Sequence, residues 1–136
     1  MTKPHNIPVA IGLIIKDSCA LLGKRTSGHY SGYWEFPGGK IESGETSEQA
    51  LVREMREELS IDVVKATEVI HIRDDHQITL FHLQIWHIDE YKGPIIANEQ
   101  QHLQWARIDS LEKLNIIPTN VPILHYLKQL EANRQS

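Results

Sequence analysis

The sequence has little of several features that would place a protein in a special class. Only one cysteine, Cys19, occurs among the 136 residues, which excludes an internal disulfide. No apolar run approaches the ~18–20 residues that cross a membrane. The first residues, M-T-K-P-H-N, also lack the apolar core of a secretory signal. We therefore expect a cytoplasmic protein without membrane attachment.

An excess of positive charge is also missing. Lys and Arg total 14 against 18 Asp and Glu, which gives a formal net charge of −4. A nucleic-acid surface needs a basic patch to neutralise phosphates, so we expect no direct nucleic-acid binding. A free nucleotide is still a candidate ligand, because a metal ion can supply the positive charge. The length suits a single domain, residues 1–136, and we expect a monomer.

What the sequence does contain is an acidic segment between Gly39 and Ile61. Glu57 and Glu58 follow Glu54 by three and four residues, so on a helix these carboxylates share one face. Like charges placed this closely repel one another unless a cation lies among them. Carboxylate oxygens are the ligands that Mg²⁺ and Mn²⁺ prefer. The segment predicts a divalent-metal site with Mg²⁺ as the cofactor, for which Mn²⁺ could substitute.

Local signals predict that a helix carries these glutamates. Thr46 and Gln49 form a capping-box pattern, which would start the helix near Ser47. The apolar residues of the opposite face would pack inward; they are Val52, Met55 and Leu59. An alternative is an ordinary solvated amphipathic helix whose charges form surface ion pairs.

The remaining pattern favours the α+β class, because strands are followed by isolated helices without a βαβ rhythm. Strands are expected at residues 9–15, 20–23, 63–73, 76–89 and 103–108, and helices at 109–114 and 121–132. The first two strands would form a hairpin around Asp17. The third and fourth would be antiparallel partners, with Asp74 and Asp75 in the turn.

The acidic segment resembles the signature of the Nudix hydrolases, G-x5-E-x7-R-E-U-x-E-E-x-G-U, where U is a bulky apolar residue. The matching residues are Gly39, Glu45, Arg53, Glu54, Met55, Glu57, Glu58 and Ile61. The fixed position that differs is the second glycine, which is Ser60 here. Glycine ends a helix in a left-handed conformation without strain, so serine should cost about 1 kcal/mol or bend the exit. The resemblance implies a Nudix-type α/β/α sandwich with a mixed β-sheet.

The resemblance also implies roles for individual residues. The implied metal ligands are Glu54, Glu57 and Glu58, together with the carbonyl of Gly38 or Gly39. Arg53 would orient these glutamates without touching substrate. Glu99, in A-N-E-Q-Q-H, would be a further ligand or the general base, and the alternative is an exposed loop carboxylate.

Two further stretches resemble the MutT subgroup, W-E-F-P-G-G-K-I-E from residue 34 and P-T-N-V-P-I from residue 118. This subgroup converts 8-oxo-dGTP to 8-oxo-dGMP and pyrophosphate, which removes a mispairing precursor from the nucleotide pool. The implied substrate-binding residues are Arg25, Phe36, Ile78 and Asn120. Three of these could instead have a purely structural role. Asn120 could cap the last helix, Phe36 could belong to the hydrophobic core, and Arg25 could be a surface residue beside Lys24.

We therefore predict a Mg²⁺-dependent 8-oxo-dGTP diphosphatase. Divalent cations bridge polyphosphate oxygens and lower the pKa of a bound water, and a nearby carboxylate can take its proton. One alternative is a Nudix pyrophosphatase for another nucleoside triphosphate or a nucleoside diphosphate derivative. Another is a non-catalytic nucleotide-sensing module, which the full set of glutamates argues against.

Overall fold

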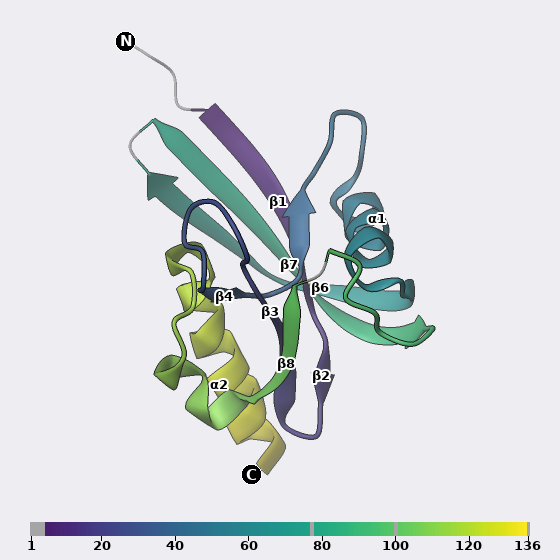
Figure 1. Cartoon of the computed structure of the whole chain (residues 1–136), viewed down its shortest axis with the longest axis vertical. Coiled ribbons are helices and arrows are strands. Elements are labelled where there is room, and N and C mark those ends of the chain that lie inside the picture. The colour runs from purple at the N-terminus through teal and green to yellow at the C-terminus, as the bar shows by residue number, and fades with distance from the viewer. Residues whose placement is uncertain (1–4, 77, 100, 136) are drawn as a thin grey trace. The chain divides into compact units, whose positions relative to one another are not determined.

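The computed structural model describes residues 5–76, 78–99 and 101–135 (Figure 1). The chain divides into two compact units, each assembled from separate stretches of sequence. Unit 1 contains Met1–Leu13 and Pro37–Asn98, and unit 2 contains Ile14–Phe36 and Glu99–Ser136. The assignment of residues 1–136 to one domain stays a prediction.

Unit 1 is a four-stranded mixed sheet with one helix packed on it. Its elements are β1 (His5–Leu13), β5 (Gly38–Lys40), α1 (Ser47–Leu59), β6 (Asp62–His76) and β7 (Thr79–Lys92). The strand order is β5-β1-β7-β6, in which β1 runs parallel to β7 and the other neighbours are antiparallel. The mixed sheet with its helix confirms the α+β prediction.

The helix α1 packs on this sheet through residues spaced four apart. Leu51, Met55 and Leu59 are fully buried, whereas Val52, which we expected on this face, is only half-buried. The four-residue spacing of these three side chains defines the stripe that faces the core, and Val52 lies one position off it. Gly12 of β1 permits the close approach, since a Cβ there would lie 3.1 Å from Leu51 Cδ1.

Unit 2 is a second, antiparallel sheet with helical segments that follow it in the chain. Its elements are β2 (Ile15–Lys16), β3 (Cys19–Lys24), β4 (Trp34–Glu35), β8 (His102–Arg107), the 3₁₀ helices η1 (Ile108–Lys113) and η2 (Pro118–Asn120), and α2 (Val121–Gln135). The buried apolar side chains include Leu21 and Leu22 from β3, Leu111 from η1 and Leu127 from α2. No helix in the described part of the chain is long and apolar enough to cross a membrane.

Some predicted strand boundaries are wrong. Residues 9–15 do not form one strand, because Ile14 separates β1 in unit 1 from β2 in unit 2. The hairpin therefore joins β2 to β3, with Asp17 and Ser18 in left-handed conformation at the turn. Asp74 and Asp75 lie within β6 instead of in a turn. Within the described residues β6 is an edge strand whose neighbour is β7, and charged side chains are common on such strands.

Candidate active site

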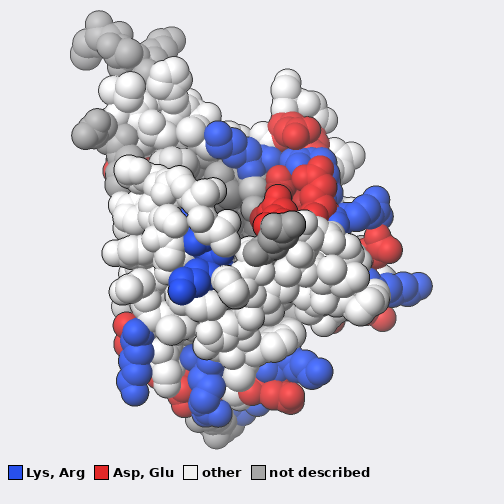
Figure 2. Space-filling view, in the orientation of Figure 1, with Lys and Arg blue, Asp and Glu red and all other residues white. Residues whose placement is uncertain are grey.

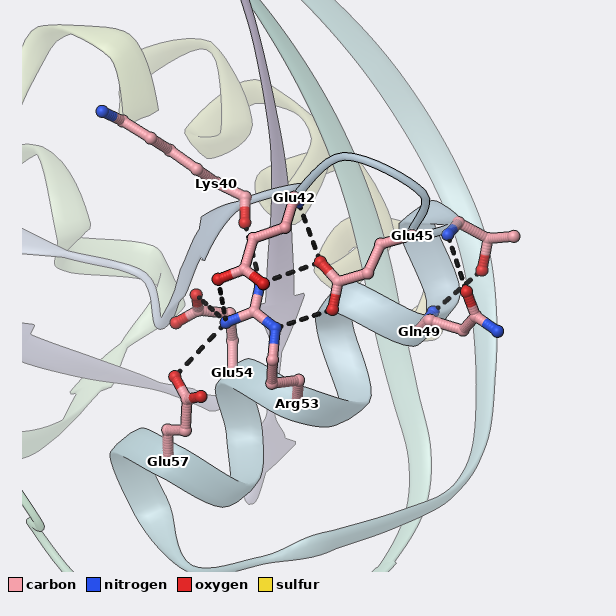
Figure 3. Close-up of polar contacts among 8 residues, drawn as sticks. Lys40, Glu42, Glu45, Gln49, Arg53, Glu54 and Glu57 are labelled. Carbon is pink, nitrogen blue, oxygen red and sulfur yellow. Dashed lines mark hydrogen bonds and ion pairs between the residues drawn. The ribbon is translucent and has the colours of Figure 1, made fainter.

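The helix that carries the predicted ligands begins as its sequence indicates. The Gln49 N–H donates to Thr46 Oγ1 at 3.1 Å, and the Thr46 N–H donates to Gln49 Oε1 at 2.9 Å (Figure 3). This capping box confirms the predicted start at Ser47. The indole N–H of Trp86 donates to Ser47 Oγ at 2.8 Å, which ties the first turn of α1 to β7.

Arg53 lies at the centre of an acidic cluster, where its guanidinium contacts several carboxylates at once (Figure 3). Its Nε and Nη2 donate to the two oxygens of Glu45, at 2.6 and 2.9 Å. Its Nη1 donates to Glu54 at 2.8 Å and to Glu57 at 3.3 Å. Nη2 also donates to the Lys40 carbonyl at 2.9 Å, which connects α1 to the end of β5.

The charges of this cluster are strongly coupled. The Arg53 hydrogen bonds, followed by the backbone N–H of Glu42, lower the pKa of Glu45 to about 2. The hydrogen bond with Glu45, followed by that with Glu54, raises the pKa of Arg53, so Glu45 and Arg53 both stay ionised at neutral pH. Figure 2 shows acidic and basic side chains gathered side by side over α1. The guanidinium of Arg53 therefore offsets the repulsion between Glu54 and Glu57, which share a helix face.

Glycines at residues 38 and 39 let the backbone of β5 approach the acidic helix closely. The Gly38 N–H donates to Glu58 Oε2 at 2.9 Å. A Cβ on Gly39 would overlap the carboxylate of Glu54, and one on Gly38 would overlap the Ala10 carbonyl. The glycine pair therefore forms a cradle for the carboxylates of Glu54 and Glu58. A side chain at Gly38 would meet the backbone of β1, and one at Gly39 would displace the Glu54 carboxylate.

The donor set suits a hard divalent cation. The side chains of Glu54, Glu57 and Glu58 and the carbonyls of Gly38 and Gly39 offer oxygen only, which is the ligand type of Mg²⁺ and Mn²⁺. In the structure these carboxylates face Arg53 and the Gly38 N–H. Among the described residues, no group of three or more His, Cys, Asp or Glu side chains is gathered as a metal cage. Their roles as ligands stay predictions.

Glu99 and Ile78 belong to different units from the residues that were predicted to act with them. Glu99 is the exposed first residue of the second stretch of unit 2, and its N–H donates to Gln101 Oε1 at 3.1 Å. The glutamates of α1 belong to unit 1. Ile78 is 54% exposed at the turn between β6 and β7 of unit 1, whereas the other predicted base-site residues are in unit 2. The roles of both residues stay predictions.

Within unit 2, the structure brings Asn120 and Phe36 together. Asn120 is 3% exposed, and its Oδ1 accepts the Phe36 N–H at 3.0 Å. Its Nδ2 donates to Thr119 Oγ1 at 3.3 Å. The oxygen that we considered as a cap for the last helix therefore joins η2 to the residue after β4. Phe36 is also 3% exposed, so both side chains are buried.

The predicted substrate residue Arg25 supports a loop. Its Nε donates to Glu35 Oε2 and its Nη1 to the His29 carbonyl, both at 2.9 Å. The neighbouring Lys24 lies over the Trp34 ring, with Nζ 5.8 Å from the ring centroid. These contacts separate the two cations: Arg25 is directed into the loop before β4 and Lys24 toward Trp34.

Asn98, for which the sequence predicts no role, lies against the C-terminal end of α1. Its side-chain amide donates to Ser60 Oγ at 2.5 Å and to the Glu57 carbonyl at 3.2 Å. The only signal in the sequence was its position beside Glu99.

Comparisons with known proteins agree with this geometry. A family model described as "NUDIX domain" matches residues 6–127. A CTP pyrophosphohydrolase of Escherichia coli K12 is 34% identical over 129 residues, which is 94% of this chain and 96% of the relative. An 8-oxo-dGTP diphosphatase of the same strain is 32% identical over 129 residues, which is 91% of this chain and 98% of the relative.

Solved structures show the same likeness. The solution structure of the E. coli ORF135 protein matches with a TM-score of 0.85 and 33% identity, covering 96% of this chain and 94% of that one. A structure from a study of MutT from Aliivibrio salmonicida and Vibrio cholerae matches with a TM-score of 0.77 and 30% identity. The match covers 90% of this chain and 96% of that one. The chain therefore belongs to the Nudix family. It is a hydrolase of diphosphate bonds, in a family that acts on nucleotides and generally uses divalent metal ions.

Proposed function

We propose that the protein hydrolyses a nucleoside triphosphate to a monophosphate and pyrophosphate in a Mg²⁺-dependent reaction. The observation that carries the proposal is the cluster of Glu54, Glu57 and Glu58 beside the glycine cradle. Arg53 holds Glu54 and Glu57, and the Gly38 N–H holds Glu58. Its all-oxygen donor set can hold a cation against a triphosphate.

In this mechanism Glu54, Glu57 and Glu58 would hold the metal, together with a carbonyl of Gly38 or Gly39. Mg²⁺, when bound, neutralises phosphate oxygens and makes a water more acidic. Arg53 orients the carboxylates without touching substrate. A glutamate that is within reach of the attacking water accepts its proton, and Glu99 is our candidate besides the α1 glutamates.

We propose 8-oxo-dGTP as the first substrate candidate, because the residues from Trp34 and from Pro118 resemble the MutT subgroup and several relatives carry that activity in their names. CTP is the second candidate, favoured by the CTP pyrophosphohydrolase that is 34% identical. The buried Asn120 does not choose between them. Its oxygen is engaged by Phe36, and its N–H donors suit carbonyl acceptors, which both bases carry.

With 8-oxo-dGTP as substrate, the biological role would be sanitisation of the nucleotide pool, which limits mutation during DNA replication. We propose that the protein acts on free nucleotides in the cytoplasm as a monomer, with Arg25, Phe36, Ile78 and Asn120 forming the base site. The net charge of −4 supports a free nucleotide over a nucleic acid as the ligand.

A substrate panel tests the proposal. We would measure kcat/KM for 8-oxo-dGTP, dGTP, CTP and dCTP with Mg²⁺, and identify the labelled product in ¹⁸O-water. We expect a nucleoside monophosphate and pyrophosphate, with 8-oxo-dGTP preferred over dGTP. Preference for CTP would select the second candidate, and release of orthophosphate as the first product would refute the pyrophosphohydrolase assignment.

A further inference from the structure

Residues 96–98, a segment of unit 1 distant in sequence, cap the C-terminal end of α1 with hydrogen bonds (Figure 1). The last carbonyls of a helix have no partner within the helix and need one elsewhere. Here the Ile96 N–H donates to the Leu59 carbonyl at 2.9 Å, and the Asn98 N–H donates to the Glu58 carbonyl at 3.0 Å. The side chain of Asn98 donates to the Glu57 carbonyl at 3.2 Å. The last three carbonyls of the helix, those of Glu57, Glu58 and Leu59, are therefore bonded from outside it.

Asn98 makes more of these contacts than any other residue of the segment. Its Nδ2 lies 2.5 Å from Ser60 Oγ and 3.4 Å from the Arg56 carbonyl, in addition to its bond to Glu57. A side-chain amide nitrogen has two N–H groups, so one residue can hold two of these acceptors at once. Asn98 therefore holds the carbonyls of Glu57 and Glu58 together with the side chain of Ser60.

Ser60 explains why this chain needs such a contact. It occupies the position of the second glycine in the Nudix signature and has a left-handed backbone, with φ 61° and ψ 26°. A side chain in that conformation is strained, and the strain favours unwinding of the helix end. The hydrogen bond from Asn98 to Ser60 Oγ stabilises the conformation that a glycine would adopt freely.

The carboxylate that depends most on this support is Glu57. Its side chain is 57% exposed, and its contact with Arg53 is long, at 3.3 Å. Glu58 is better fixed, because its Oε2 accepts the Gly38 N–H at 2.9 Å. The direction of Glu57 therefore depends on the backbone that Asn98 holds as well as on its contact with Arg53.

We propose that Asn98 is a positioning residue for hydrolysis: it fixes the last turn of α1 so that Glu57 and Glu58 are directed correctly for the metal. The same residue anchors the chain immediately before Glu99. This inference rests on the proposed function, in which these glutamates are metal ligands. Outer residues that orient metal ligands are nearly as important to metal sites as the ligands themselves.

The test compares Asn98→Ala and Asn98→Asp with Asn6→Ala. Asn98→Asp keeps the shape and the backbone bond but removes the side-chain donor. Asn6 is a matched control in the same unit, because its Oδ1 has one exposed contact, 3.2 Å from His82 Nε2. For each protein we would measure Mn²⁺ affinity by electron paramagnetic resonance without substrate, hydrogen exchange of the amides of residues 56–60, and kcat and KM.

We expect both Asn98 variants to bind Mn²⁺ about 10- to 100-fold more weakly and to lose a similar factor in kcat. Exchange at residues 56–60 should become faster, the KM for the triphosphate should stay within about threefold, and Asn6→Ala should behave like the wild type. Wild-type Mn²⁺ affinity and kcat, accompanied only by a lower melting temperature, would show that Asn98 contributes to stability alone and would overturn the proposal.

Failure of the proposed function would be visible separately. A wild type that binds Mn²⁺ but hydrolyses no nucleotide would refute the function, and Mn²⁺ affinity would then decide the role of Asn98. If Asn98→Ala does not fold, Asn98→Asp decides by the same criteria.

Discussion

At the scale of single residues, the arrangement of the site depends on one guanidinium among several carboxylates. Arg53 contacts Glu45, Glu54 and Glu57, so a change at any of these carboxylates also alters the surroundings of the others. Substitutions in this cluster therefore need separate measurements of activity and of stability.

We predict that Glu57→Gln nearly abolishes hydrolysis, because an amide is a poor ligand for Mg²⁺ and cannot accept a proton from water. The side chain is mostly exposed, so the fold should persist. The assay is kcat at saturating Mg²⁺, with circular dichroism as the control for folding. A folded variant that keeps more than about a tenth of wild-type kcat, a loss below ~1.4 kcal/mol, would disprove the ligand assignment.

The low pKa of Glu45 predicts how stability depends on pH. Its ordinary value is 4.5, and contact with Arg53 lowers it to about 2 in the folded protein. Because the folded value is the lower one, this carboxylate stabilises the fold above pH 4.5 and loses that contribution as the pH falls toward 2. We expect Glu45→Gln to show a smaller loss of stability than the wild type across this range, measured by urea unfolding. If the stability of both proteins fell equally with pH, the effect of Arg53 on the pKa of Glu45 would be contradicted.

Asn120 has a structural role that can be tested separately from substrate recognition. Asn120→Ala removes the acceptor of the buried Phe36 N–H, so the free energy of unfolding should fall by about 1–3 kcal/mol. Thermal unfolding measures this loss, and the ratio of kcat/KM for 8-oxo-dGTP over dGTP measures base selectivity. A lower melting temperature with unchanged selectivity would remove Asn120 from the proposed base site.

At the scale of elements, local signals predicted α1 well and the strands less well. The start of α1 was predictable because Thr46 and Gln49 are close in sequence and cap the helix by themselves. The break at Ile14 was not, because the apolar pattern runs through it without a turn signal. The closure of α1 by Asn98 was also hidden, since it joins residues far apart in sequence and leaves no periodic pattern.

The end of α1 offers a double-mutant test. In the Asn98→Ala background, Ser60→Gly should stabilise the protein by about 1 kcal/mol, because glycine relieves the left-handed strain. In the wild type the gain should be smaller, since the change also removes the hydrogen bond to Asn98. Chemical unfolding of the wild type, the two single variants and the double variant gives the coupling free energy between Asn98 and Ser60. Equal effects of Ser60→Gly in both backgrounds would show that the two residues act independently.

At the scale of the whole molecule, metal binding should be visible as stability. If the acidic cluster holds Mg²⁺ only in the folded state, free Mg²⁺ at 100 times its dissociation constant should add about 2.7 kcal/mol. Melting with Mg²⁺ and with a chelator measures the difference, and Glu57→Gln is the control that should lose it. Equal stabilisation of the wild type and Glu57→Gln would place the cation elsewhere.

The parallel pairing of β1 with β7 also affects biosynthesis. It joins His5 to Thr79 and Leu13 to His87, so the first strand of unit 1 leaves the ribosome long before its partner has been made. Such non-local pairing slows folding, because the intervening chain must be ordered first. Until β7 emerges, the edge of β1 opposite β5 stays unpaired, and other chains could bind it. We expect arrested nascent chains to resist protease in unit 1 only when Lys92, the end of β7, has cleared the exit tunnel.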